Sequence, residues 1–180
     1  MINRELYMEQ ITPFIDKPFV KVITGIRRCG KSVVLRLIRE ELLRRGVSED
    51  HIIYMNFESF EWMDVKEAKA LYTYIREVTK VSGKYYILLD EIQEVTDWEK
   101  AVNAFLVDLD ADIYVTGSNS RLLSSEFSTY LAGRYVAFHI MTLSFREYLL
   151  FHNVPLAISA SDRKAEFLKY LRMGGLDRKS

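Results

Sequence analysis

Residues 25–32 read GIRRCGKS and directly follow the apolar stretch FVKVIT at 19–24. Glycine tolerates positive φ, so the first glycine can turn the chain out of a strand without steric cost. A second glycine five residues later is followed by Lys-Ser and the apolar run VVLRLI, which indicates a loop that leads into a helix. The spacing G-x-x-x-x-G-K-[ST] between a strand and a helix is that of a phosphate-binding loop.

A triphosphate needs a dense positive potential, which the backbone N–H groups of a glycine loop and a helix N-terminus supply. In this interpretation Gly25 turns the chain, Gly30 lets the backbone approach the β-phosphate, and Lys31 reaches the β- and γ-phosphate oxygens. The Ser32 hydroxyl is the predicted ligand of Mg²⁺. The predicted nucleotide-binding residues are Gly25, Ile26, Arg27, Arg28, Cys29, Gly30, Lys31, Ser32 and Val33.

The stretch YYILLDEI at 85–92 is the second candidate site. Its apolar residues predict a strand that places Asp90 and Glu91 at its carboxyl end, where open α/β sheets bind ligands. We expect Asp90 to join Ser32 around Mg²⁺, and Glu91 to polarise a water for attack on the γ-phosphate. Paired acids at a strand end are by themselves often only a solvated turn.

Composition restricts the class of protein. The 180 residues suffice for one domain, with 49% hydrophobic and 28% charged residues, and 25 basic side chains balance 25 acidic ones. This balance does not point to nucleic acid or to a membrane surface as a partner. A single cysteine excludes an internal disulfide and favours a reducing compartment, and no apolar run is long enough for a membrane span. We therefore expect a cytoplasmic protein. We expect no zinc site, because the three histidines lie far apart in the sequence.

The remaining pattern alternates strands and helices. Five short, nearly continuous apolar runs predict strands buried on both faces, as in a parallel sheet, at 19–24, 51–57, 85–90, 112–117 and 135–141. Helical periodicity lies between them at 32–45, 65–81 and 98–109. The alternation is typical of an α/β fold with a mainly parallel sheet and helices on both faces, the three-layer sandwich of P-loop NTPases.

The pattern changes after residue 143. Ser144 is a predicted N-cap, and Glu147 three residues later completes a capping box. A further helix is predicted over about 162–172, and the two glycines at 174–175 make a turn that leads onward. We expect an ATPase core at 1–155, followed at 156–180 by a helical segment that leads to a C-terminal domain absent from this chain.

Three further places in the sequence each allow a functional and a purely structural interpretation. The stretch YVTGSNS ends a strand in polar side chains. In P-loop ATPases with an additional strand, a polar residue at this strand end orients the attacking water, and Asn119 or Ser118 is the candidate here. An ordinary turn explains the stretch nearly as well. Arg134 is a candidate for neutralising charge on the transferred phosphoryl group, from the same or a neighbouring subunit, or else a surface arginine. For Cys29 there are two interpretations. The nearby helix N-terminus and Lys31 could lower the pKa of its thiol and make it reactive, or Cys29 is simply a small residue tolerated at a variable position.

Four ordered motifs carry a family resemblance: VITGIRRCGKS, ILLDEIQEVTDWEKAVNAF, VTGSNSRLLSSEFSTYLAGRYVAFHIMTLSFREYLLF and YLRMGGL. Together they resemble the AAA+-related ATPases of bacteria and archaea that carry the Asp-Glu-Ile-Gln acidic motif. The resemblance implies a sheet order of 5-1-4-3-2, a C-terminal domain after the Gly-Gly turn, and functional roles for Lys31, Ser32, Asp90, Glu91, residues 117–119 and Arg134. Thr142 departs from the proline that the family usually has, and residues 177–180 depart from its usual continuation.

The sequence thus predicts Mg²⁺-dependent binding and hydrolysis of ATP, with homo-oligomerisation through Arg134 as an open possibility. ATP is preferred to GTP because of the resemblance and because no Asn-Lys-x-Asp motif is present. The alternative is a slow-turnover switch that uses bound ATP to hold a conformation or a partner. A small-molecule phosphotransferase is disfavoured, because its acceptor is not water and Glu91 would have less purpose.

Overall fold

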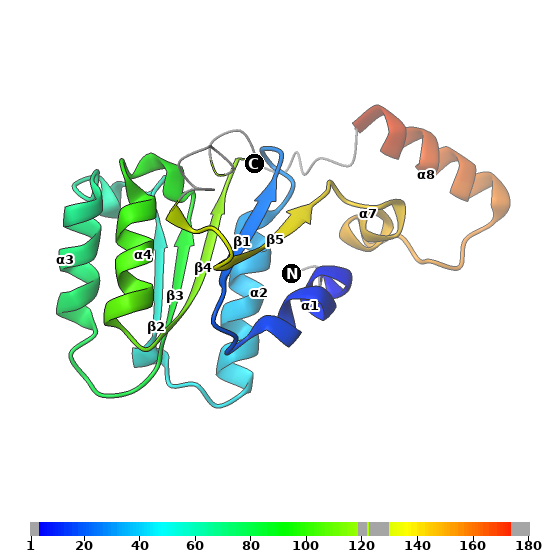
Figure 1. Ribbon diagram of the computed structural model, residues 1–180. Helices are drawn as coiled ribbons and strands as arrows, with labels where there is room; N and C mark the ends of the chain where they lie inside the picture. The colour runs from blue at the N-terminus through cyan, green and yellow to red at the C-terminus, as the bar shows by residue number, and fades with distance from the viewer. Residues whose placement is uncertain (1–3, 119–121, 123–129, 174–180) are drawn as a thin grey trace.

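A five-stranded, all-parallel sheet forms the centre of the protein (Figure 1). The computed structural model describes residues 4–118, 122 and 130–173. Its strands are β1 (Val20–Gly25), β2 (Ile52–Asn56), β3 (Tyr85–Asp90), β4 (Ala111–Gly117) and β5 (Tyr135–Ile140). They lie in the order β2-β3-β4-β1-β5, which confirms the order 5-1-4-3-2 implied by the resemblance.

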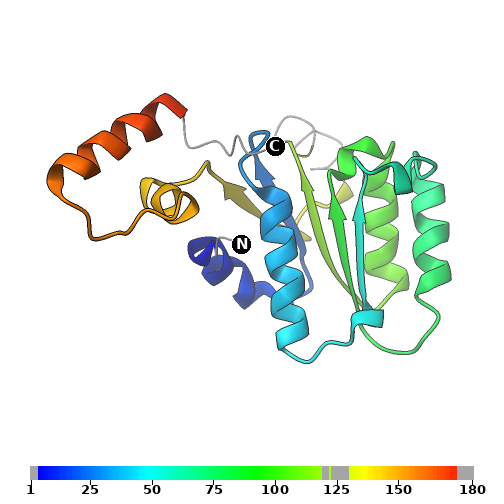
Figure 2. The ribbon, with the colours of Figure 1, turned by 180° about the vertical axis from the view of Figure 1, so that it is seen from behind.

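Helices cover both faces of the sheet, as the sequence predicts (Figures 1 and 2). One face is covered by α1 (Glu5–Ile11) and α2 (Lys31–Arg44), and the other by α3 (Ala68–Val78) and α4 (Trp98–Asp108). Short 3₁₀ turns lie at Thr12–Phe14, Glu49–His51, Phe60–Trp62 and Ile92–Glu94. The layers form the three-layer α/β sandwich expected from the alternating pattern.

The continuous apolar runs have a simple structural cause. Successive side chains of a strand point to opposite faces, so a strand covered on both sides needs apolar residues at every position. In β3, Ile87 and Leu89 pack in the core beneath α3 and α4, while Tyr86 and Leu88 pack in the core beneath α2. Two hydrophobic cores, one on each side of the sheet, therefore stabilise the fold.

The last two helices lie beyond the β5 edge of the sheet in both views (Figures 1 and 2). These are α7 (Phe145–Phe151) and α8 (Ala160–Met173). The predicted capping box is present: the Ser144 hydroxyl accepts from the Glu147 N–H, and the Glu147 carboxylate accepts from the Ser144 N–H. Across the parts of the chain that the structure describes, no helix has the length and apolar character needed to cross a membrane.

Two elements differ from the sequence-based expectations. The α3 helix begins at Ala68 rather than near 65, because Glu67 is held extended in a bridge to Thr96. The α1 helix has no counterpart among the predicted elements, although Tyr7 and Ile11 have the four-residue spacing of a buried helix face and are both buried. The N-terminal segment is thus part of the core.

Candidate functional site

The carboxyl ends of the parallel strands share one edge of the sheet, and the candidate site lies there. β1 ends at Gly25 and α2 begins at Lys31, which leaves five residues for the loop between them. A Cβ on Gly25 would lie 2.4 Å from the Ile140 carbonyl oxygen, and Gly30 has a φ of 99°. Both positions therefore require glycine, one for space and one for its backbone conformation.

A cavity of about 350 Å³ lies against this loop. Six residues of the predicted nucleotide-binding set line it: Arg27, Arg28, Gly30, Lys31, Ser32 and Val33. Arg36, Glu58 and Glu91 complete the lining. Most of the charged side chains around the cavity are cationic, which suits an anionic ligand. Glu58 contacts Arg27 at 3.9 Å, and both side chains are largely exposed.

Lys31 and Glu91 meet inside this cavity. The Lys31 ammonium is 4% exposed and lies 3.3 Å from a carboxylate oxygen of Glu91, which is 15% exposed. Lys31 is the first residue of α2, where the helix dipole already contributes positive potential. A buried cation at that position needs a negative partner, and Glu91 supplies it.

Asp90 is fully buried at the end of β3, and hydroxyl groups hold both of its oxygens. Thr116 donates to Oδ1 at 2.5 Å, and Tyr54 donates to Oδ2 at 3.0 Å. Burial and the neighbouring carboxylate raise the pKa of Tyr54, so its phenol remains a proton donor. The Asp90 carboxylate therefore has a fixed orientation.

The backbone at Glu91 is strained. Its φ of 54° is in the left-handed region, which is uncommon for a residue other than glycine. The Glu91 N–H donates to the Thr116 hydroxyl at 3.0 Å, so Thr116 holds the side chain of Asp90 and the backbone of Glu91 together. Strained residues of this kind cluster at functional sites, because the surrounding structure must maintain them.

Gln93, which is not among the predicted site residues, contacts Glu91 directly. Its side-chain N–H donates to the second oxygen of the Glu91 carboxylate at 2.7 Å. A Cβ on Gly117 would lie 2.1 Å from the Gln93 side-chain oxygen, so the glycine at the end of β4 makes room for this amide. The signal in the sequence was the position of Gln93 two residues after Glu91 in the acidic motif.

The site fits a magnesium–nucleotide complex in its donor set. Mg²⁺ prefers oxygen ligands and is commonly held by one or two protein groups, the substrate phosphates and water. Ser32 supplies a hydroxyl in the wall of the cavity, and Asp90 supplies a buried carboxylate at the same edge of the sheet. Within residues 4–118, 122 and 130–173, no group of three or more His, Cys, Asp or Glu side chains forms a metal-only site.

Arg134 is not brought to this site. It directly precedes β5, and its carbonyl accepts from the Val20 N–H at the start of β1. Its guanidinium donates to the Asn103 side chain at 3.0 Å. Because β1 and β5 are parallel, about 16 Å of strand separates Arg134 from Gly25. Arg134 therefore lies at the edge of the sheet opposite the loop between β1 and α2.

Two other candidates have different outcomes. Asn119 lies outside the described residues, whereas Ser118 directly follows β4 and its carbonyl accepts from the Leu122 N–H. Cys29 is buried, and its burial raises the pKa of the thiol despite the nearby charges of Lys31 and Arg4. A raised pKa disfavours the thiolate, so the interpretation of Cys29 as a small residue is preferred.

The arginines of α2 separate into two groups. Arg39 pairs with Glu49, and Arg44 and Arg45 pair with Glu41, as expected for a solvated helix face. Arg36 instead lines the phosphate-loop cavity and donates to the Ser32 carbonyl at 3.3 Å. Arg36 therefore belongs to the wall of the site, unlike the other three arginines.

Known proteins are similar to this chain in sequence. An uncharacterized protein of Haemophilus influenzae is 46% identical over 172 residues, and the alignment covers 94% of this chain and 43% of that protein. An uncharacterized protein of Methanocaldococcus jannaschii is 35% identical, with coverage of 95% and 36%. The chain thus spans less than half the length of these relatives.

Solved structures with low sequence identity share the fold. Cdc6p from Pyrobaculum aerophilum superposes with a TM-score of 0.57 at 12% identity, over 85% of this chain and 50% of that one. AMPPCP-bound DnaA from Aquifex aeolicus gives 0.55 at 16% identity, over 97% and 62%. The AAA domain family matches residues 17–149, which include the phosphate loop, the acidic strand end and all five strands. With that match over most of its length, the chain belongs to the AAA domain family.

Proposed function

We propose that this domain binds ATP with Mg²⁺ and hydrolyses it. The observation that carries the proposal is the buried contact between Lys31 and Glu91 in a cavity at a glycine loop and a helix N-terminus. The loop supplies backbone N–H groups, and α2 supplies its positive end, so the cavity suits a phosphate chain. The AAA domain match supports a nucleotide as the ligand.

Each side chain has a distinct role in this proposal. Lys31 would leave Glu91 and contact the β- and γ-phosphate oxygens, and Ser32 and Asp90 would hold the metal ion. Bound Mg²⁺ would neutralise charge on the phosphate oxygens. Glu91, released from Lys31, accepts the proton of the attacking water. Gln93 keeps the Glu91 carboxylate oriented through its hydrogen bond.

A second function, the slow-turnover switch, is favoured by the position of Arg134. One copy of the chain holds its phosphate loop at one edge of the sheet and Arg134 at the other. An arginine on the transferred phosphoryl group then has to come from a neighbouring copy packed head to tail, an arrangement that forms rings or filaments. A single copy lacking that arginine would bind ATP and turn it over slowly.

The length of the relatives supports a further part of the proposal. The chain covers 43% of the Haemophilus influenzae relative, which agrees with residues 156–180 leading from the ATPase core into a C-terminal domain. That domain would be the part that the nucleotide state acts upon. The biological target of the protein would then depend on residues outside this chain.

The test is a pair of measurements on the purified chain. A fluorescent ATP analogue is titrated with and without Mg²⁺, and steady-state release of phosphate is followed with water as the only acceptor. We expect micromolar binding, roughly the range of enzyme substrates, and Mg²⁺-dependent release of phosphate. Binding without any release, at all protein concentrations, would favour the switch; absence of binding would contradict both functions.

A further inference from the structure

Arg4 is a buried cation in the segment before α1. Its side chain is 2% exposed, and its guanidinium lies 4.6 Å from the centre of the Tyr7 ring. One terminal nitrogen donates to the Cys29 carbonyl at 2.8 Å, and the other donates to the Met141 carbonyl at 2.9 Å. The Nε atom lies 2.8 Å from the carboxylate of Glu147. One side chain therefore joins the phosphate loop, the chain after β5 and the start of α7.

Such burial needs a reason, because a guanidinium removed from water is costly unless it is paired and hydrogen-bonded. A hydrophobic residue would fill the same space without that cost. The planar guanidinium instead presents several N–H donors in a fixed geometry. Here its two terminal nitrogens donate to carbonyls of two separate segments, and its charge pairs with Glu147 in a third, although Nε itself has no well-aligned hydrogen bond. Arg4 is thus suited to setting the relative positions of these segments.

The contact with Cys29 has a direct consequence for the loop. A trans peptide is planar, so its carbonyl and the following N–H point in opposite directions. Arg4 holds the Cys29 carbonyl on its own side, which aims the Gly30 N–H to the other side. Gly30 lines the phosphate-loop cavity, and a Cβ at this position would lie 3.2 Å from Arg4. If this peptide turned over, its carbonyl would face the cavity and repel an anion.

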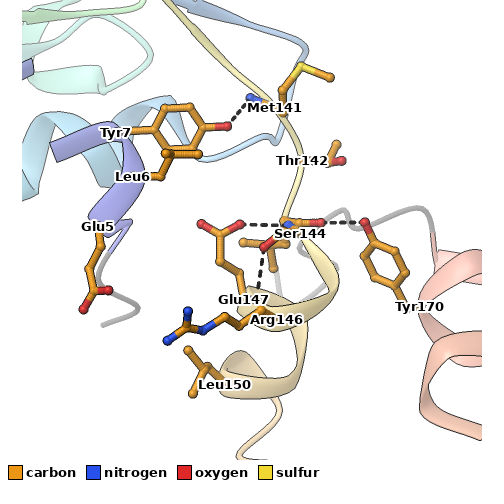
Figure 3. Close-up of a pocket in the computed structure, with 11 residues that line it drawn as sticks. Glu5, Leu6, Tyr7, Met141, Thr142, Ser144, Arg146, Glu147, Leu150 and Tyr170 are labelled. Carbon is orange, nitrogen blue, oxygen red and sulfur yellow. Dashed lines mark hydrogen bonds between the residues drawn. The ribbon is translucent and has the colours of Figure 1, made fainter. Parts of the chain in front are cut away.

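Glu147 extends the connection into α7. One carboxylate oxygen pairs with Arg4. The other accepts from the Ser144 N–H at 2.8 Å in the capping box, a contact that Figure 3 shows. The Met141 N–H donates to the Tyr7 hydroxyl in the same region, beside a cavity of about 730 Å³ between α1, α7 and Tyr170 of α8 (Figure 3). A shift of α7 would therefore move the carboxylate that pairs with Arg4.

We infer that Arg4 is a positioning residue that couples the phosphate loop to α7. It maintains the Cys29–Gly30 peptide in the anion-binding orientation, and Glu147 makes that orientation depend on the position of α7. This inference rests on the proposed function, since the anion is the phosphate chain of ATP. The coupling is reciprocal by thermodynamic linkage. The α7 position that pairs Glu147 with Arg4 favours ATP binding, and ATP binding stabilises that α7 position by the same free energy.

Two substitutions test the connection while retaining side-chain volume. Arg4→Lys keeps a cation but lacks the planar guanidinium that donates to both carbonyls while facing the Glu147 carboxylate. Glu147→Gln keeps an oxygen for the capping box and removes the charge that faces Arg4. Arg146→Gln is the matched control, because Arg146 is an exposed cation of the same helix turn that lines the same cavity. Circular dichroism and thermal unfolding establish that each variant folds.

The expected results are specific to positioning. Affinity for the fluorescent ATP analogue falls about tenfold in Arg4→Lys and in Glu147→Gln, the order associated with one charged hydrogen bond. The double variant is no worse than the poorer single variant, because both act through one contact. Without added nucleotide, the NMR chemical shift of the Gly30 amide differs from that of the parent chain in both variants. It is unchanged in Arg146→Gln.

A second readout follows α7 itself. In the parent chain, addition of Mg²⁺ and a non-hydrolysable ATP analogue slows amide hydrogen exchange across 145–151, and in Arg4→Lys this slowing is lost. Folded Arg4→Lys and Glu147→Gln variants with parental affinity and an unmoved Gly30 signal would overturn the inference alone. If the parent chain binds no ATP, the proposed function is contradicted instead. The Gly30 amide chemical shift in Glu147→Gln then still shows whether Glu147 controls the orientation of the loop peptide.

Discussion

The Lys31 ammonium and the Glu91 carboxylate lie 3.3 Å apart, so the predicted phosphate-binding cation and the predicted base neutralise each other. Neither group can perform its proposed role while this pair persists. A triphosphate that draws Lys31 to its own oxygens therefore also releases Glu91 toward water. In the proposed mechanism, ATP binding and activation of the base are therefore one event.

Glu91→Gln is expected to keep or improve affinity for Mg²⁺–ATP and to stop turnover. Glutamine retains the shape and one hydrogen-bond acceptor, but it cannot accept the proton from water, and its neutral amide no longer competes for Lys31. Titration and phosphate release measure the two quantities separately. Glu77→Gln, on the exposed face of α3, is the control. Turnover within about threefold of the parent would remove Glu91 from the mechanism.

Lys31→Ala is expected to abolish binding of ATP at concentrations where the parent saturates. The substitution removes the cation at the start of α2 and leaves the Glu91 carboxylate in the cavity, where it repels the γ-phosphate. Titration of the fluorescent analogue measures the loss. Lys69→Ala removes an exposed lysine of α3 and should leave affinity unchanged. An unchanged affinity in Lys31→Ala would place the nucleotide elsewhere.

Gln93→Ala is expected to lower kcat about tenfold with little change in KM, because it removes one hydrogen bond to the charged Glu91 carboxylate. Gly117→Ala should act in the same direction, since its Cβ would displace the Gln93 side chain. Steady-state kinetics of both variants check this relationship. A fall in affinity with unchanged kcat would instead assign Gln93 to nucleotide binding.

Arg134 is expected to act only between copies. Specific ATPase activity should rise with protein concentration, and Arg134→Ala should reduce it by about 10³–10⁵ if the arginine stabilises the transition state. A Lys31→Ala copy cannot bind ATP but still offers Arg134, so mixing it with Arg134→Ala should restore activity. Activity that is independent of concentration, with no rescue in the mixture, would leave Arg134 with its contact to Asn103 alone.

Asp112→Ala is expected to reduce the free energy of unfolding by about 3–5 kcal/mol, because it leaves the fully buried Lys21 ammonium without its carboxylate. The pair lies near the amino ends of β1 and β4, remote from the phosphate loop. Chemical denaturation measures the stability, and titration of the folded variant should give the parental affinity for ATP. A weakened affinity would mean that the two edges of the sheet are coupled.

The sequence by itself determined the sheet, the phosphate loop and the acidic strand end. These features depend on neighbouring residues: the apolar run of a buried strand, glycines at the two positions of the loop that need them, and Lys31 and Ser32 at the start of the next helix. Ser144 and Glu147, three residues apart, specified the start of α7 in the same local way. Local spacing is sufficient wherever the backbone conformation follows from short-range sterics and hydrogen bonding.

Only the tertiary structure decided which distant side chains meet. Thr116 and Tyr54 reach Asp90 from two other strands, and Arg4 reaches Cys29 across 25 positions of sequence. Arg134 precedes the last strand, and the parallel direction of β5 places it at the edge opposite the phosphate loop. Spacing along the chain carries no information about such contacts, because they arise when hydrophobic burial packs the strands and helices together.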